Sequence, residues 1–316
     1  MGATFYALNV GRGDAFFLEI RPQPGVSGGS SVVLIDGGHQ TDETRIMPDE
    51  FMELQGWRRV DLMILTHLHF DHLAGLLPVA RRFEIGEAVL PYPCLRIGPV
   101  VARQPQAEQT LRTFRMYEEL VAILEERGVP VAWRPPFGDR AVWEFGNGLR
   151  LRHVSPFEGM PLPAYERMKR LAGSDDLPVS DAERLLAEFD SYSNLDSSVW
   201  VLERGDGEAP WLLFGGDALL PVWEVLMRKE RLNPRGFKVP HHGMRDAVDL
   251  RVLSALRPEW AVITNGRDEY VRFRDEWESL YGEAACDLFV TGAEPATVYL
   301  ACELPGKPRK VVAGSR

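Results

Sequence analysis

Four residues of metal-ligand type lie close together in the segment Thr-His-Leu-His-Phe-Asp-His, residues 66–72. His67 and His69 are two positions apart, so on extended backbone both side chains can turn toward one point. Asp71 and His72 follow at the start of an expected helical segment and can reach a neighbouring point. Imidazole nitrogen and carboxylate oxygen suit Zn²⁺, Mn²⁺ or Fe. The segment therefore predicts two adjacent metal sites, an arrangement that clamps both the attacking and the leaving oxygen of a displacement.

The elements around this segment must position it. An apolar strand is expected at 61–66 directly before it, and an interrupted helical segment at 72–83 after it, where Pro78 limits the regularity. Ser180 and Glu183 predict a capping box at the start of a later helix. The strands expected at 4–10 and 14–20 form a hairpin, and a second hairpin is expected at 141–154. Other strands are expected at 31–38, 86–90, 197–203, 210–216, 236–240 and 259–265, and helices at 105–128, 219–231, 246–256 and 273–282. Paired strand runs interleaved with helices predict sheets packed face to face with helices outside.

The composition is that of an ordinary globular protein. Of the 316 residues, 45% are hydrophobic and 26% are charged, which excludes intrinsic disorder. The net charge of −10 argues against a protein that grips nucleic acid non-specifically through a basic face. Metal ions would still supply positive charge at a hydrolytic site. No apolar stretch approaches 18 residues, so no membrane span is expected. Three cysteines without metal-like spacing, and no signal peptide, predict a cytoplasmic protein.

Four segments, in this order along the chain, resemble the metallo-β-lactamase fold hydrolases: LIDGG (34–38), THLHFDH (66–72), LLFGGD (212–217) and VPHHG (239–243). The opening ALNVGRGD (7–14), Asn194 and Ser197 before a strand, and FKVPHHG are most similar to the ComEC/Rec2-like branch, the hydrolase domain of DNA-uptake proteins, and its free-standing relatives. The resemblance implies an α+β fold, an αββα sandwich of two mixed sheets with helices outside. We expect a single domain over 1–316, with an insert at about 91–193 shaping the substrate groove.

The resemblance also implies roles for individual residues. Two divalent metal ions, Mn²⁺ or Zn²⁺, would be held by His67, His69, Asp71, His72, Asn194, Asp217 and His242. Asp217 would bridge the two ions, and Asp36 would be a buried carboxylate that orients the ligand loop. Asp71, Asp217 and His241 would act in catalysis, His241 as a proton donor and phosphate contact.

Several of these assignments have alternatives. Most of the superfamily has a further histidine where this chain has SYSNLDSSVWVL, so Asn194 is the candidate ligand there and His153 is its alternative. Asp36 before two glycines is also typical of a turn, and Asp217 of a helix cap. His241 and His242 together also fit a solvated pair at the end of a strand. Lys238 fits either a structural strand residue or a phosphate contact.

The function that the resemblance implies is hydrolysis by a hydroxide that bridges two metals, with DNA as the leading phosphodiester substrate. One alternative is a small-molecule hydrolase that acts on a phosphocholine or cyclic-nucleotide phosphodiester, a lactone or a thioester. The other is a non-catalytic protein in which the metals only stabilise the structure. A regulatory protein partner is a further expectation, because a long insert over the metals would have to open.

Overall fold

A computed structural model describes residues 2–312 of the chain except 24, 26–28, 135–141, 174–176 and 206. Two mixed sheets form its centre. The first has the order β15-β14-β1-β2-β3-β4-β5-β6 and consists of β1 (Ala3–Leu8), β2 (Ala15–Ile20), β3 (Ser31–Gly37), β4 (Arg59–Ile64), β5 (Glu84–Leu90), β6 (Val131–Trp133), β14 (Thr297–Leu304) and β15 (Arg309–Val312). The second has the order β13-β12-β11-β10-β9-β8-β7 and consists of β7 (Val142–Glu144), β8 (Leu149–Ser155), β9 (Val199–Arg204), β10 (Leu212–Phe214), β11 (Gly236–Lys238), β12 (Trp260–Ile263) and β13 (Asp287–Val290).

The alternation of side chains along the strands explains the layers. In β3, Val33 and Ile35 point into the core between the two sheets, whereas Val32 and Leu34 point to the helices on the outer face. Trp200 and Trp260 fill the same inter-sheet core from the second sheet. Helices cover both outer faces, so the expected αββα sandwich is confirmed.

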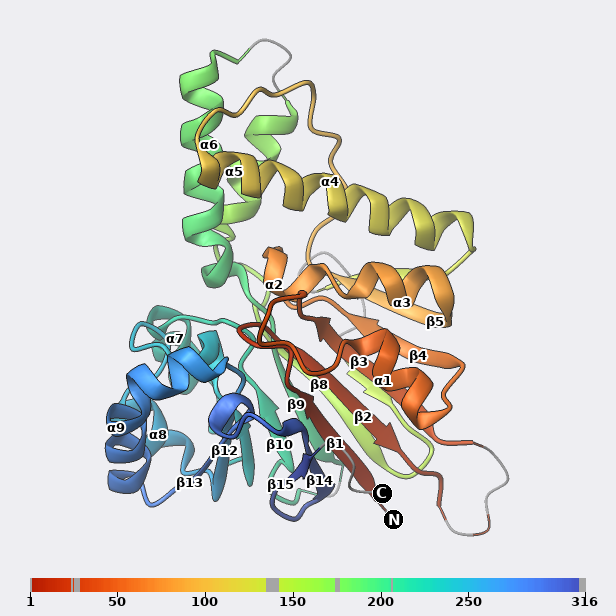
Figure 1. Ribbon diagram of the computed structural model, residues 1–316, viewed down its shortest axis with the longest axis vertical. Coiled ribbons are helices and arrows are strands. Elements are labelled where there is room, and N and C mark those ends of the chain that lie inside the picture. Colours follow the sequence, from red (N-terminus) through yellow and green to blue (C-terminus); the bar gives the residue numbers. More distant parts are fainter. Residues whose placement is uncertain are drawn as a thin grey trace.

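The helices divide between the two faces. Helices α1 (Pro48–Gln55), α2 (Phe70–Leu73), α3 (Leu76–Arg82) and α4 (Pro105–Glu126) pack on the first sheet, and α7 (Leu220–Lys229), α8 (Leu250–Leu256) and α9 (Arg267–Glu283) on the second. Helix α4 also packs against α6 (Val179–Ser193), which packs against α5 (Pro163–Ala172). Figure 1 shows α4, α5 and α6 as a helical lobe at one end of the sandwich.

The segment 91–193, expected as an insert that shapes the substrate groove, also contributes strands to both sheets. It contains this helical lobe, but it also supplies β6, β7 and β8 to the sheets, because side chains such as Leu151 fit the core between them. The hairpin expected at 141–154 is confirmed as the antiparallel pair β7 and β8. The part outside the sandwich is therefore in two pieces, one carrying α4 and the other α5 and α6.

Two local predictions were wrong. Helix α6 begins at Val179 after Pro178 without a side-chain cap, and the carboxylate of Glu183 instead accepts hydrogen bonds from the backbone of residues 103 and 104. The helical segment at 72–83 breaks at Gly75 rather than at Pro78, which lies in the first turn of α3 and is tolerated there. A side chain at Gly75 would collide with the carbonyl of Gly37, so glycine permits this close approach of α2 to β3.

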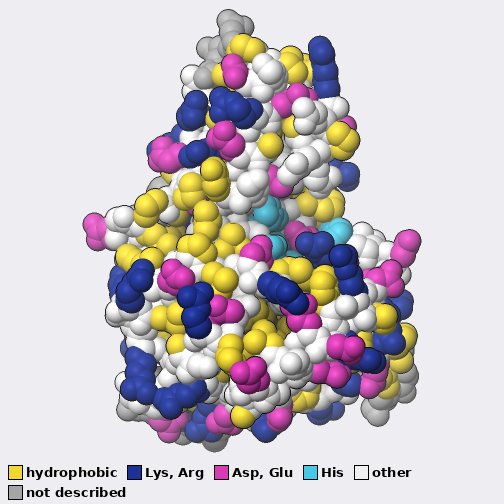
Figure 2. All heavy atoms as spheres, turned by 90° about the vertical axis from the view of Figure 1, so that its left-hand side faces the viewer, with side chains coloured by type: hydrophobic (Ala, Val, Ile, Leu, Met, Phe, Trp, Pro, Cys, Tyr) yellow, Lys and Arg dark blue, Asp and Glu magenta, His cyan; other side chains and the backbone are white. Residues whose placement is uncertain are grey.

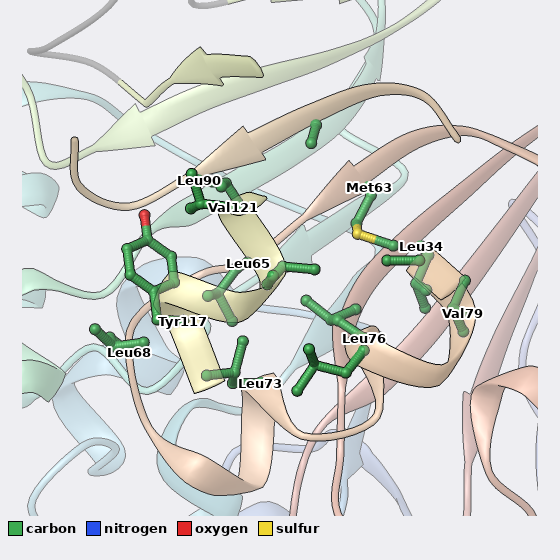
Figure 3. Close-up of a cluster of buried hydrophobic side chains, with 14 of the residues drawn as sticks. Leu34, Met63, Leu65, Leu68, Leu73, Leu76, Val79, Leu90, Tyr117 and Val121 are labelled. Carbon is green, nitrogen blue, oxygen red and sulfur yellow. The ribbon is translucent and has the colours of Figure 1, made fainter. Parts of the chain in front are cut away.

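The histidine-rich segment is anchored by its apolar residues. Leu65, Leu68 and Leu73 are fully buried between the first sheet and helices α3 and α4. Figure 3 shows these side chains packed among Leu76, Tyr117 and their neighbours. Because leucines alternate with the histidines, burial of the leucines holds the polar side chains at the edge of the core, above the ends of the strands.

Candidate metal centre

The candidate site lies where the carboxyl ends of parallel strands from both sheets meet. Strands β3 and β4 are parallel in the first sheet, and β10, β11 and β12 are parallel in the second. Polar residues follow or end each of these strands: Asp36 at β3, His67 after β4, Asp217 after β10, Lys238 and His242 at β11, and Thr264 after β12. Asp14 joins them from the loop between β1 and β2. Chain segments far apart in sequence thus contribute to one cluster.

Three imidazole nitrogens surround one carboxylate oxygen. The Oδ2 atom of Asp217 lies 3.3 Å from Nε2 of His72, 3.4 Å from Nε2 of His242 and 3.9 Å from Nε2 of His67. Nε2 of His242 also lies 3.2 Å from Oδ2 of Asp71. These three histidines are buried, and none of the three Nε2 atoms has a hydrogen-bond partner among the described residues.

Hydrogen bonds fix the tautomers of these rings. Nδ1 of His242 lies 3.1 Å from the carbonyl oxygen of Thr264, and Nδ1 of His72 lies 2.9 Å from Oδ2 of Asp36. Because these oxygens only accept, Nδ1 must donate, and in the neutral ring Nε2 carries the lone pair. The same argument applies to His67. The hydroxyl of Thr66 donates to Asp36, so it accepts a hydrogen bond from Nδ1 of His67. The three Nε2 atoms therefore point at Asp217, and in the neutral ring each would offer its lone pair to a metal ion.

The residues present fit divalent metal ions. Their atoms form overlapping groups that could each hold an ion, with His72, Asp217 and His242 each in more than one group. The groups are His67–His72–Asp217, Asp71–His72–His242, Asp14–Asp217–His242 and Asp14–Asp36–His72. Nitrogen and carboxylate donors of this kind suit Zn²⁺, Mn²⁺ and Fe. Asp217 belongs to two of these groups, and its role as a bridge between two ions remains a prediction.

The charges of the cluster shift several pKa values. Burial lowers the pKa of His67 well below its ordinary value. Burial acts in the same direction on His72 and His242, but the carboxylate of Asp217 outweighs it and raises the pKa of both rings well above the usual range. Burial would raise the pKa of Asp217, but the two imidazolium rings hold it well below its ordinary value. Without metal, protons on these histidines thus balance the carboxylates.

Asp36 and the histidine pair adopt strained backbone. The φ angles of Asp36, His241 and His242 are 57°, 47° and 52°, in the left-handed region that side chains other than glycine rarely occupy. Asp36 is fully buried and is not a plain turn residue: it accepts hydrogen bonds from the backbone and hydroxyl of Thr66. Burial raises its pKa, against the opposing effect of His72. Such strain gathers at functional sites, where surrounding contacts hold it in place.

The structure places the two adjacent histidines differently. The Nε2 atom of His242 joins the cluster, whereas the side chain of His241 lies at the wall of the pocket with Nδ1 2.8 Å from Oδ1 of Asp246. The backbone N–H of His241 donates to Oδ1 of Asp217. Asp217 caps no helix, because α7 begins at Leu220 after Leu219. Asp246 is a pocket residue that the sequence analysis missed.

His69 and Asn194 remain predictions as metal ligands. Nε2 of His69 lies 3.0 Å from the carbonyl oxygen of Asp190 in α6, so it is outside the cluster of imidazole nitrogens. Ligation by this nitrogen requires His69 to give up that contact. Asn194 lies beside the pocket, and its Oδ1 atom is buried without a hydrogen-bond partner. His153, the alternative to Asn194, packs on Trp200 in the sheet and belongs to none of the ligand groups found among the described residues.

Asp14 and Lys238 form a buried ion pair that the sequence analysis missed. Both side chains are fully buried, and the ammonium of Lys238 contacts the carboxylate of Asp14. This ammonium also donates to the carbonyl of Gly216 at 2.9 Å and lies 3.8 Å from Oδ1 of Asp217. Lys238 is therefore neither a phosphate contact nor only a strand residue. Burial would raise the pKa of Asp14, but Lys238 and His242 lower it. The only signal in the sequence was the place of Asp14 in the GRGD turn.

An open pocket of about 420 Å³ leads to the cluster. Its walls come from the sandwich and from the helical lobe, since Gln109 and Thr113 of α4 and Asp190 and Ser191 of α6 line it together with the cluster. Figure 2 shows histidine side chains in a hollow between the lobe and the sandwich. Arg12 is the one arginine among the residues that line this pocket.

The arginines of the 91–193 stretch mostly serve the fold. Arg134 is fully buried and donates to the carbonyl of Thr66, and Arg150 and Arg152 pair with Glu203. Arg112 lies over the ring of Phe70. None of these four lines the pocket, so the described residues form no basic groove there.

Comparisons with known proteins identify the superfamily of this chain. The family model of the metallo-beta-lactamase superfamily matches residues 11–266. Solved structures to which this chain is similar include unliganded yeast PDE1, a diphosphatase of the PhnP family, and CmlA, a diiron beta-hydroxylase from Streptomyces venezuelae. Their identities to this chain are 13%, 13% and 12%, and their TM-scores are 0.46, 0.42 and 0.47. The alignments cover 92%, 96% and 96% of this chain, and 98%, 98% and 54% of the respective structures.

A second comparison finds a short match only. The mitochondrial adenyl nucleotide antiporter SLC25A25 of Mus musculus and of Rattus norvegicus is 35% identical over 66 residues. This match covers 21% of the chain and 14% of either antiporter, which assigns no family. Among the helices of the described residues, none is long and apolar enough to cross a membrane.

Proposed function

We propose that this chain, which belongs to the metallo-β-lactamase superfamily of metal-dependent hydrolases, is a phosphodiesterase that uses two divalent metal ions to cleave DNA. One observation carries the proposal. Three buried imidazole nitrogens without hydrogen-bond partners converge on the carboxylate of Asp217 at the floor of an open pocket. A buried polar cluster of this kind is costly unless a cation completes it.

Divalent metal ions held by His67, His72, Asp217 and His242 would supply Lewis-acid charge for the activation of water and for the stabilisation of negative charge on the phosphate. The residues of the chain hold and orient this charge. Asp36 accepts a hydrogen bond from the ring of His72 and reaches the ring of His67 through the hydroxyl of Thr66. Asp14 and the carbonyl of Thr264 both lie against Nδ1 of His242. Asp217 faces all three rings. His241, whose Nδ1 lies 2.8 Å from Oδ1 of Asp246 in the pocket wall, would protonate the leaving oxygen.

The pocket limits which DNA can enter. A volume of about 420 Å³ is enough for a nucleotide-sized group. The helical lobe forms one wall, and among the described residues that line the pocket Arg12 is the one lysine or arginine that can meet a phosphate. A single strand or a strand end therefore fits the pocket better than an intact duplex. The same observation favours a second candidate substrate, a small phosphodiester that fills the pocket alone.

A substrate panel tests the proposal. Purified protein loaded with Mn²⁺ or Zn²⁺ is given single-stranded DNA, plasmid DNA, bis(p-nitrophenyl) phosphate, a lactone and a thioester. We expect cleavage of single-stranded DNA and of the small phosphodiester, with slower attack on plasmid. Asp217→Asn removes the central charge with little change of shape, and it should abolish both metal retention and turnover. Asp275→Asn is the matched control, because this carboxylate is 90% exposed.

Each other outcome contradicts part of the proposal. Turnover of the small phosphodiester alone would favour the second candidate, and turnover of only the lactone or thioester would exclude phosphodiester chemistry. A fully metallated protein that turns over nothing would support a non-catalytic protein in which the metals only stabilise the structure, or an enzyme that needs a partner protein.

A further inference from the structure

A second pocket adjoins the candidate metal centre. It has a volume of about 410 Å³ and is walled by Met244, Phe273 and Trp277. It shares residues with the pocket over the cluster, and these are Arg12, His241 and Asp246. The two pockets are therefore neighbours along one continuous surface, with the side chain of His241 between them.

The aromatic wall of the second pocket is preformed. Trp277 is 2% exposed, and its indole N–H donates to the carbonyl of Gly243 at 2.9 Å. A Cβ atom at Gly243 would lie 2.7 Å from Ile263, so the turn that carries His242 packs tightly beneath this wall. The ring of Phe273 lies 5.7 Å from that of Trp277, one helical turn away in α9, and is half-buried. The pocket is thus walled by the half-buried ring of Phe273 backed by Trp277, with the guanidinium carbon of Arg272 4.9 Å from the centre of the Phe273 ring.

Arg12 lines both pockets, and its positive charge has no partner among the described residues. It lies at the tip of the β1–β2 loop and is exposed. Within the described part of the chain, its guanidinium forms no hydrogen bond or ion pair, whereas Arg245 across the second pocket is paired with Glu276. A guanidinium presents donors in a fork that matches a phosphate. Arg12 is therefore free to hold a phosphate at the boundary of the two pockets.

We infer that the pocket walled by Met244, Phe273 and Trp277 is a subsite for a nucleobase, attached to the phosphodiester that lies at the metal-ligand cluster, with Arg12 binding the phosphate between them. The inference rests on the proposed phosphodiesterase function and narrows its substrate to nucleotides. An aromatic wall accepts any base, because every base offers a π-face for stacking, so the subsite gives preference for nucleotides without preference for sequence.

Two esters with the same leaving group test this subsite. Thymidine 5′-(p-nitrophenyl) phosphate carries a base, and methyl p-nitrophenyl phosphate does not. Phe273→Ala should raise the KM of the thymidine ester about tenfold relative to that of the methyl ester, the size expected for loss of one base–aromatic stack. Phe273→Leu should do the same, and Phe273→Tyr should keep the wild-type ratio. Val271→Ala is the matched control, because it lies on the same helix and is 63% exposed.

Arg12→Gln has a different expected signature. It should raise the KM of both esters by a similar factor, because both carry the phosphate. Thermal denaturation and metal content of each variant show that the fold and the cluster are intact.

A binding measurement separates failure of the subsite from failure of the proposed function. Titration calorimetry of thymidine 5′-monophosphate and of inorganic phosphate needs no turnover. Tenfold weaker nucleotide binding by Phe273→Ala, in a protein that hydrolyses neither ester, would support the subsite and overturn the phosphodiesterase. Turnover of both esters with a KM ratio that neither Phe273→Ala nor Phe273→Leu alters would keep the phosphodiesterase and overturn the subsite.

Discussion

His241 and His242 are neighbours in the chain but have different partners, so we expect their substitutions to differ. His242→Ala removes an Nε2 atom that lies within 3.4 Å of both Asp71 and Asp217. This substitution should lower the affinity for metal by about tenfold to a hundredfold. His241→Ala should retain metal and lower kcat by about 10²–10⁴, the usual contribution of a general acid. Elemental analysis and kcat are measured on both variants. Metal loss from the His241 variant alone would show that the two roles are reversed.

The buried ion pair of Lys238 and Asp14 gives a second prediction about single residues. Lys238→Met leaves the carboxylate of Asp14 buried without its nearest cation, which should lower the free energy of unfolding by about 3–5 kcal/mol. Adding Asp14→Asn should recover part of this loss, because the uncompensated charge is then gone. Urea denaturation in the presence of a chelator measures both. Lys307→Met is the control, since its pair with Asp287 is exposed and is worth at most about 1 kcal/mol. A loss as small as that of the control would contradict the expectation.

Among the elements, α6 connects the helical lobe to the candidate site. Its buried Phe189 packs on Phe114 of α4 with ring centroids 4.5 Å apart, and the helix runs directly into Asn194. Phe189→Ala should therefore cost about 3–5 kcal/mol of unfolding free energy and also weaken metal binding. Leu54→Ala, at a position 62% exposed, should change neither. Loss of stability with unchanged metal affinity would show that the lobe does not position the site.

For the helices and strands, the sequence predicted the two-sheet sandwich well and the candidate site in part. Strand periodicity and the leucines between the histidines are local signals, so the β1–β2 hairpin and the ligand segment could be read from them. The partners of Asp14 are 224 and 250 positions away, and the carbonyl that contacts His69 is 121 positions away. Such contacts depend on how the two sheets and the lobe are arranged, which no local pattern encodes. The capping box at Ser180 failed for the same reason, because Glu183 instead binds the chain before α4.

For the whole molecule, the balance of charge around the cluster connects metal binding, protons and stability. The cluster contains four carboxylates, those of Asp14, Asp36, Asp71 and Asp217, and one ammonium, that of Lys238. The chain as a whole is also acidic, with a net charge of −10. Bound cations would relieve this excess of negative charge and attract a phosphate into the pocket. Without them, protons must reduce this charge, and the surrounding carboxylates accordingly raise the pKa values of His72 and His242 against the effect of burial.

Metal removal should therefore make stability depend on pH in a specific direction. In the metal-free protein, the folded-state pKa values of His72 and His242 lie well above the unfolded value of about 6.5. Their stabilising effect is fully present below that value and is lost as pH rises through the folded-state values. We expect the Tm of chelated protein to fall as pH rises above about 7, while the metal-loaded protein keeps its Tm over the same range.

The same groups predict proton release when metal binds. The raised pKa values favour a proton on Nε2 of both rings in the metal-free protein, and a cation would displace it, so we expect binding to release up to about two protons per chain at pH 7. Calorimetric titration with Zn²⁺ or Mn²⁺ in buffers of different ionisation enthalpy measures this number directly. His242→Gln should reduce the release by about one proton, whereas His241→Gln, whose ring faces Asp246, should leave it unchanged. Metal binding without proton release would mean that these two imidazoles are neutral in the free protein, and the metal-free protein should then lose no stability between pH 7 and 9.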